Sequence, residues 1–185
     1  MAATYHLTSP LSDEDIAKCH AGDTLLLNGT VYAARDSAHK RLVRMMDEGK
    51  ELPVDFAGAV IYYVGPSPAP PGKAIGSAGP TTSYRMDPYT ERMLEIGVKV
   101  TIGKGGRSPQ VRQALQKHRA LYCAAVGGAA AVISQRVRKA EVVAFEELGP
   151  EALRRLTVEE FPCIVINDAY GADLYESGVK AYRRL

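Results

Sequence analysis

Helix-type and strand-type segments alternate along residues 87–135 of this 185-residue chain. Helices are expected over residues 87–96, 108–118 and 128–135, and apolar strands over residues 98–102 and 121–126. Strands that alternate with helices in this way form a sheet with the helices packed against it. The sequence therefore predicts the α/β class.

The rest of the chain adds shorter elements of the same two kinds. A capping sequence at Ser12 starts a short helix that ends by Gly22, and Asp36 caps a second helix that stops at Gly49. Prolines between residues 65 and 72 make that segment a connecting loop. The other expected elements are a strand or strand pair over residues 23–34, bent at Asn28-Gly29, strands over residues 56–64, 141–145 and 163–167, and a helix over residues 149–155.

Hydrophobic residues make up 46% of the chain, which is enough for one continuous core without a disulfide framework. Neither a repeat nor a low-complexity linker divides the sequence, so residues 1–185 are expected to form a single domain. The 23 basic and 21 acidic residues leave a net charge of +2 and are dispersed along the chain. Nucleic acid is therefore not an indicated partner.

The three cysteines, Cys19, Cys123 and Cys163, are far apart in the sequence and have no spacing typical of a metal or cluster site. They are expected to be small buried apolar residues. The amino terminus has no charged stretch followed by an apolar run, and no apolar segment is long enough to cross a membrane. These features predict a soluble, cytoplasmic protein that holds no metal of its own.

Residues 76–104 carry the strongest signal for a binding site. Gly79 and Pro80 impose an irregular backbone, Thr81 and Thr82 follow with two hydroxyls, and Arg85 comes one helical turn later. A helix and a strand then lead to Lys104 in a glycine-rich turn. Hydroxyls, a guanidinium and an ammonium around one small pocket suit an anionic substrate.

The turn itself, G-K-G-G-R-S at residues 103–108, has two simpler interpretations. Glycine amides before a helix can bind phosphate, but the spacing is wrong for a Walker loop because Gly105 follows the lysine. The turn can also be a solvated strand end with a stray lysine. A nucleotide site is the weaker of these alternatives.

A second polar group, R-D-S-A-H-K-R at residues 35–41, stands where a strand ends and a helix begins. Such junctions often bind ligands. The plainer interpretation is that Asp36 caps the helix while His39, Lys40 and Arg41 face solvent, which leaves Arg35 unexplained. A hydrolase triad is excluded, because Ser37 and His39 are too close together and no G-x-S-x-G motif occurs.

Several long motifs resemble one family, the β subunits of class I fumarase and tartrate dehydratase. They read N-G-T-V-Y-A-A-R-D-S-A-H-K-R at 28–41, P-V-D-F-A-G-A-V-I-Y-Y-V-G-P at 53–66, G-P-T-T-S-Y-R-M-D at 79–87, I-G-K-G at 102–105, V-G-G-A-A-A at 126–131, A-F-E-E-L-G-P-E-A at 144–152 and F-P-C-I-V-I-N-D at 161–168. The resemblance covers nearly the whole chain in order. It implies the swivelling β/α/α domain found in the C-terminal region of class I fumarases.

The resemblance also implies an activity, a partner and roles for single residues. The chain is expected to be the β subunit of a [4Fe-4S] hydro-lyase, with the cluster held by three cysteines of an α subunit in a hetero-oligomer. By matching motifs, Arg35, Arg85 and Lys104 bind the dicarboxylate, Thr81 abstracts the proton and Thr82 lies beside it.

The substrate stays open between two diacids. Tyr84 stands where many fumarases have a small residue. Fumarate hydration to malate is preferred, and L(+)-tartrate dehydration is the alternative. Two alternatives belong to other classes. A module that binds small anions or nucleotides would bind its ligand without iron, and a purely structural assembly domain would tolerate the loss of Arg85 and Lys104.

Overall fold

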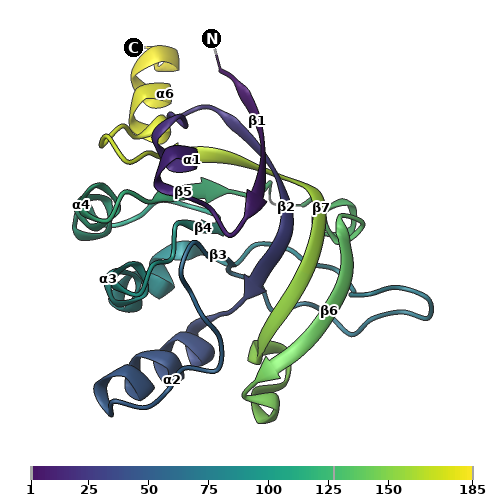
Figure 1. The fold of residues 1–185 in the computed structure, drawn as a ribbon. Coiled ribbons are helices and arrows are strands. Elements are labelled where there is room, and N and C mark those ends of the chain that lie inside the picture. Colours follow the sequence, from purple (N-terminus) through teal and green to yellow (C-terminus); the bar gives the residue numbers. More distant parts are fainter. Residues whose placement is uncertain (1, 127, 185) are drawn as a thin grey trace.

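Seven strands pair in the order β1-β2-β3-β4-β5-β7-β6 in the computed structural model, which describes residues 2–126 and 128–184 (Figure 1). The strands are β1 Thr4–Ser9, β2 Thr24–Ala33, β3 Val60–Tyr62, β4 Val100–Gly103, β5 Leu121–Ala124, β6 Val137–Ala144 and β7 Leu153–Asn167. The helices are α1 Asp13–Ala17, α2 Asp36–Asp47, α3 Asp87–Glu95, α4 Pro109–Lys117, α5 Ala130–Ser134 and α6 Leu174–Tyr182, with 3-10 helices η1 Ser83–Met86 and η2 Glu146–Glu151.

The sheet is mixed, and part of it closes on itself. Strands β1 to β5 pair in parallel, whereas β7 pairs antiparallel with β5, β6 and β2. The β2–β7 pairing completes a circuit through β3, β4 and β5. Closing a sheet removes its exposed edges, so β1 and β6 are left as the two edge strands.

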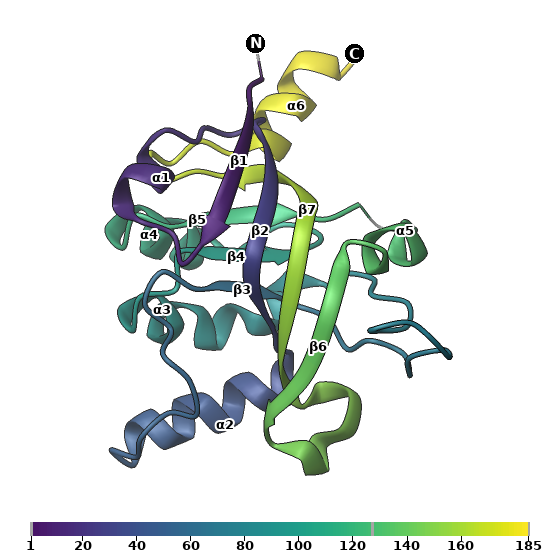
Figure 2. The same cartoon turned by 45° about the vertical axis from the view of Figure 1, so that its right-hand side comes forward.

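Alternating side chains divide the core into two clusters. On β3, Val60 and Tyr62 pack inside the circuit, whereas Ile61 packs outside it against the helices. Helices α2, α3 and α4 cover that outer side of β3, β4 and β5 (Figures 1 and 2). A strand covered on both faces reads as a continuous apolar run, which is the pattern of this segment.

The structure confirms the α/β class and many of the expected elements. Ser12 caps α1 in a capping box with Asp15. The pairing register of β2 shifts between Leu27 and Gly29, where the Asn28-Gly29 bend is predicted. Helices α3 and α4 and strands β4 and β5 lie within two residues of their expected bounds.

The carboxyl-terminal third differs from the prediction. The helix expected over residues 149–155 is wrong, because β7 begins at Leu153 and runs for 15 residues as the longest described strand. The alternation of buried and exposed side chains along β7 is interrupted at Glu160, because this residue adopts a left-handed φ of 51°. Asn28 compensates for it by donating to the Glu160 carboxylate at 2.9 Å and accepting from the Glu160 amide at 3.0 Å. Helix α6 was not predicted.

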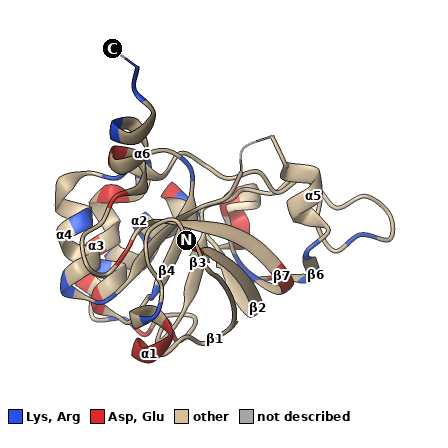
Figure 3. Cartoon of the chain, turned by 90° about the horizontal axis from the view of Figure 1, so that it is seen from above, with Lys and Arg blue, Asp and Glu red and all other residues tan. Residues whose placement is uncertain are grey.

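Charges of both signs are interspersed over the surface (Figure 3). Ion pairs account for many of them, such as Arg92 with Asp47 at 2.9 Å and Lys117 with Glu91 at 2.9 Å. Within residues 2–126 and 128–184, no helix has the length and apolar character needed to span a bilayer.

Candidate functional site

The predicted site residues lie where the parallel strands end. Arg35 follows β2, Gly65 follows β3, and Lys104 follows β4 directly. The carboxyl ends of parallel strands meet at one edge of a sheet, which is where α/β folds bind ligands. Residues 30 to 70 positions apart in the sequence are thereby brought to one edge.

The segment Thr81–Ser83 is inserted at this edge between the ends of β3 and β4. The Thr81 amide donates to the Tyr63 carbonyl at 2.7 Å, and the Lys104 amide donates to the Thr81 carbonyl at 3.2 Å. Thr82 pairs with Lys104 in a parallel bridge. The two threonines are half-buried and Lys104 is exposed, so Thr81, Thr82 and Lys104 form one accessible part of this edge, which we call the ledge.

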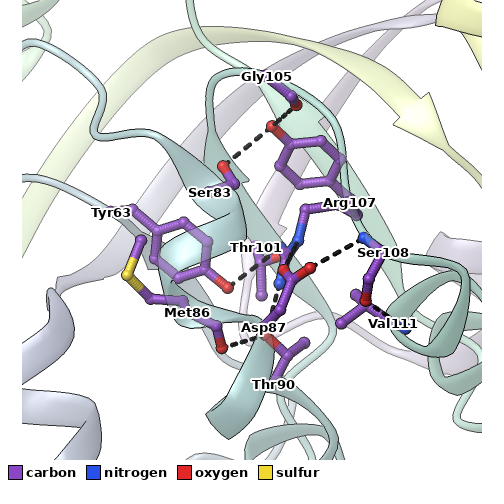
Figure 4. A network of polar contacts seen from close by, with 11 residues as sticks. Tyr63, Ser83, Met86, Asp87, Thr90, Thr101, Gly105, Arg107, Ser108 and Val111 are labelled. Carbon is purple, nitrogen blue, oxygen red and sulfur yellow. Dashed lines mark hydrogen bonds and ion pairs between the residues drawn. The ribbon is translucent and has the colours of Figure 1, made fainter.

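Buried hydroxyl groups connect the residues that follow Thr82 and Lys104, and Figure 4 shows Ser83 and Gly105 among these contacts. The Tyr122 hydroxyl lies 3.0 Å from Ser83 Oγ and donates to the Gly105 carbonyl at 2.6 Å. Gly103 leaves room for this contact, because a Cβ there would lie 2.0 Å from Ser83 Oγ. Tyr122 therefore joins the segment after Thr82 to the turn after Lys104.

Arg107 belongs to the turn for which a solvated strand end was one interpretation, but its side chain is buried. Figure 4 shows its polar contacts. Its Nε donates to Asp87 at 2.7 Å, and its Nη1 donates to the Tyr63 hydroxyl at 3.3 Å. Burial alone lowers the pKa of Arg107, but Tyr63 and Asp87 outweigh it and the pKa is raised. Arg107 thus stays charged and ties the lysine turn to the start of α3.

Asp87 also bears on the phosphate-loop alternative. Its second oxygen accepts from the Ser108 amide at 2.9 Å, and the Ser108 hydroxyl accepts from the Val111 amide at 3.3 Å. These are two of the amide groups at the start of α4 that a bound phosphate would use. They already have partners, one of them a carboxylate, which disfavours a nucleotide at this turn.

The two arginines form a separate charged cluster with two carboxylates. Arg85 Nε donates to Asp36 Oδ1 at 2.9 Å, and Arg35 Nη2 lies 3.3 Å from Glu151. Arg35 Nε and Asp36 Oδ2 lie 3.8 Å apart, and among the described residues both atoms are buried without a hydrogen-bond partner. The hydrogen bonding from Ser37, together with Arg35 and Arg85, lowers the pKa of Glu151 below its ordinary value.

This cluster corrects the helix-cap interpretation of residues 35–41. The residue at the cap position is Arg35, and Asp36 lies inside α2 with its carboxylate on Arg85. His39 is not on the solvent side: it is 1% exposed, and its Nδ1 lies 2.8 Å from the Arg35 carbonyl. Burial lowers the pKa of His39 to about 4, so this side chain is neutral at pH 7.

The structure therefore unites the five predicted residues only in part. Backbone pairing places Thr81, Thr82 and Lys104 side by side, while Asp36 links Arg35 to Arg85. The short helix η1 connects the two groups, since Arg85 follows Thr82 by three residues. Within the described part of the chain, no hydrogen bond or ion pair joins Thr81 or Lys104 to either arginine. Long-range partners such as Glu151, Asp87 and Tyr122 have no local sequence signal.

The cysteines do not fit a metal cluster. Cys19, Cys123 and Cys163 are free thiols buried in the core inside the strand circuit. Burial raises the pKa of Cys19 to about 11 and that of Cys123 well above its ordinary value. A cluster needs thiolates. In the described ranges, the one group close enough to share an ion is Glu91, Glu95 and His118, which contains no cysteine.

Comparison with known proteins gives consistent matches. The sequence model of a family described as "Fumarase C-terminus" matches residues 2–178. "Fumarate hydratase 2" of Leishmania major is 40% identical over 164 residues, which are 88% of this chain and 29% of that protein. "Fumarate hydratase class I, aerobic" of Salmonella typhimurium is 38% identical over 179 residues, 95% of this chain and 31% of that protein. The chain spans about a third of the length of these relatives.

One relative has nearly the same size as this chain. The "Putative L(+)-tartrate dehydratase subunit beta" of Methanocaldococcus jannaschii is 35% identical over 182 residues, which are 95% of this chain and 93% of that protein. A protein of this length is thus named as one subunit of an enzyme, whereas the longer relatives carry the matching region within one polypeptide.

Proposed function

The chain belongs to the Fumarase C-terminus family, and on this premise we propose that it supplies one half of the active site of a hydro-lyase acting on a four-carbon diacid. Its relatives are named for fumarate hydration and tartrate dehydration. Fumarate and malate are the preferred substrate pair, and L(+)-tartrate is the alternative.

The observation that carries this proposal is the meeting of Thr81, Thr82 and Lys104 at the edge where Arg35 also emerges. A dicarboxylate needs two or three cations to bind. Arg85 and Lys104 would hold its carboxylates, while Arg35 supports Arg85 through Asp36 and contributes positive charge. Thr82 would line the same ledge.

Proton removal is the chemistry assigned to Thr81. The proton beside a carboxylate becomes removable when the charge that develops on that carboxylate is neutralised, which Lys104 and Arg85 would do. A threonine hydroxyl is a poor base in water, so Thr81 needs a cationic neighbour to favour its alkoxide. Lys104 is the predicted cation whose backbone lies beside that of Thr81, since its amide donates to the Thr81 carbonyl.

A [4Fe-4S] cluster is proposed to lie on a companion α subunit, not on this chain. The buried thiols described above do not fit as its ligands. When bound, such a cluster supplies an open iron that can hold a substrate carboxylate and hydroxyl. This chain would contribute the cations Arg35, Arg85 and Lys104 and the two hydroxyls of Thr81 and Thr82.

Exposed apolar side chains near the ledge favour a companion. Tyr84 in η1 is 64% exposed, and Val126, just after β5, is 62% exposed. Val132 on α5 is also exposed, and the first residue of that helix is bonded to the segment before Thr81, since the Ala78 amide donates to the Ala130 carbonyl. Apolar groups beside a charged rim are typical of an interface.

The test is anaerobic reconstitution. The isolated chain is expected to be colourless and inactive, because it holds no cluster. After co-purification with a companion that contains three separated cysteines, iron–sulfur absorbance and turnover of malate or tartrate should appear together. Full turnover and iron–sulfur absorbance by the chain alone would refute the half-site proposal. Assembly and turnover that survive the loss of both Arg85 and Lys104 would favour a purely structural assembly domain.

A further inference from the structure

Two carboxylates lie against the arginines that flank the ledge. Asp36 accepts from Arg85 Nε at 2.9 Å and faces Arg35 Nε across 3.8 Å, while Glu151 lies 3.3 Å from Arg35 Nη2. The four groups together carry no net charge. Carboxylates beside an anion site weaken anion binding by Coulomb repulsion, so their presence needs a reason.

Stability alone is one reason, and the opposite end of α2 shows what a purely stabilising pair looks like. There Asp47 accepts from Arg92 Nη1, again at 2.9 Å, and joins α2 to α3. Arg85 and Arg92 are equally exposed, at 42% of the side chain. Asp47 is eleven residues from Asp36, or about 16 Å along the helix. Among the described residues, the ion-pair partners of Arg92 are Asp47 and Glu95.

Asp36 differs from Asp47 in two respects. Its carboxylate contacts two arginines, the distant Arg85 at 2.9 Å and its sequence neighbour Arg35 at 3.8 Å, whereas among the described residues Asp47 pairs with Arg92 alone. Its Oδ2 is also buried, and among the described residues it has no hydrogen-bond partner, because Arg35 Nε lies 3.8 Å away. A surface pair that serves stability alone gains nothing from such an arrangement.

We propose that Asp36 is a positioning residue of the site. By occupying the Nε edge of Arg85, it leaves the two Nη groups as the fork that can bind a carboxylate. By lying between Arg85 and Arg35, it also fixes the distance between the two guanidinium groups. The inference rests on the proposed role of Arg85 in substrate binding and assigns the orientation of that arginine to Asp36.

A double-mutant cycle in the reconstituted enzyme tests this role. Asp36→Ala should lower kcat/KM about 10- to 100-fold, because displacing a bound group by about 1 Å costs that much. In an Arg85→Ala background, Asp36→Ala should change kcat/KM less than about twofold, since residues that act through one another are not additive. Asp47→Ala should have no effect in either background. If Asp36→Ala does not assemble, Asp36→Asn keeps the shape and should show the same non-additivity.

A second readout does not depend on turnover. In ¹⁵N relaxation measurements on the isolated chain, the Arg85 Nε–H group should be as ordered as that of buried Arg107. Asp36→Ala should make it mobile, and Asp47→Ala should not. A mobile Arg85 in the unaltered chain, an ordered Arg85 in Asp36→Ala, or additive losses in the cycle would each overturn the proposal. An inactive but companion-bound wild type would instead refute the proposed reaction.

Discussion

At the scale of single residues, the three cations of the site are not equivalent. Arg35 is half-buried and held by Glu151 and Asp36, whereas Arg85 has Asp36 as its ion-pair partner in the described part of the chain. Lys104 is exposed, and among the described residues it enters no ion pair. Arg85 and Lys104 are therefore the cations most available to bind the carboxylates of a substrate.

Substitutions at these two positions should separate a binding site from scaffold. Arg85→Lys keeps the charge but loses the planar fork, so it should cost about 1.5–3 kcal/mol in transition-state binding, or roughly 10- to 150-fold in kcat/KM. Lys104→Met should be at least as damaging. Lys117→Met is the control, because Lys117 is exposed on α4 and paired only with Glu91. Near-normal kcat/KM in a folded, companion-bound enzyme with both changes would remove these residues from the site.

His39 predicts a pH dependence of stability. Its pKa is about 4 in the folded chain and about 6.5 when exposed, so the unfolded chain binds the proton first as the pH falls. The stabilisation from neutral His39 is complete above pH 6.5 and is lost between pH 6.5 and 4. This shift corresponds to about 3 kcal/mol.

Urea unfolding of the chain between pH 7 and pH 4 measures this effect. His39→Gln stays neutral over the whole range and keeps a donor for the Arg35 carbonyl. Its free energy of unfolding should fall less steeply with pH than that of the unaltered chain. Equal slopes would show that His39 takes up its proton as readily in the folded chain as in the unfolded one.

At the scale of elements, the sequence predicted those whose signals are local. The capping box at Ser12, the bend at Asn28-Gly29 and the alternation from α3 to β5 all appear where short-range patterns place them. The end of β7 was predicted as a strand over residues 163–167, but its first ten residues were missed because the alternation of buried and exposed side chains changes phase at Glu160. Side chains from distant residues, Asn28 and His6, contact Glu160 at this irregularity. A contact between residues so far apart cannot be predicted from the residues adjacent to β7 in the sequence.

The candidate site follows the same rule. Thr81, Thr82, Arg85 and Lys104 fall within one stretch of the sequence, and motif reasoning found them. Glu151 and Tyr122 reach the site through the pairing of strands that are distant in sequence. The burial of Arg107 was not predicted, because a glycine-rich turn usually faces solvent. The roles of all five predicted residues, Arg35 included, remain predictions.

The junction of β4 with η1 supplies a test at this scale. In Gly103→Ala the new methyl group would meet Ser83 Oγ at 2.0 Å and Tyr63 at 2.9 Å, in a buried place. Such overpacking should cost about 1–3 kcal/mol of stability. Gly106→Ala adds a methyl group with no heavy atom within 4 Å and should change stability by less than about 0.5 kcal/mol. Equal losses in urea unfolding would contradict the close packing of Ser83 on Gly103.

At the scale of the whole molecule, two observations agree with the proposal that this chain works together with a companion. The ledge bears cations and hydroxyls on one side, and its neighbours Tyr84 and Val126 are apolar and exposed. In the longer relatives, the matching region is about 30% of one polypeptide. A companion covering the ledge would account for both observations and would bury more than roughly 1,000 Å² if the complex is stable.

Two valines with the same exposure make this idea testable. Val126 beside the ledge and Val179 on α6, near the chain termini (Figure 1), are each 62% exposed. Val126→Asp would bury a carboxylate in the interface and should weaken companion binding more than about tenfold, because an unpaired buried charge is costly. Val179→Asp should leave binding unchanged. Native mass spectrometry of co-expressed chains measures the fraction assembled. If Val179→Asp dissociates the complex while Val126→Asp does not, the companion covers the other end of the molecule, and the ledge cannot be half of a shared site.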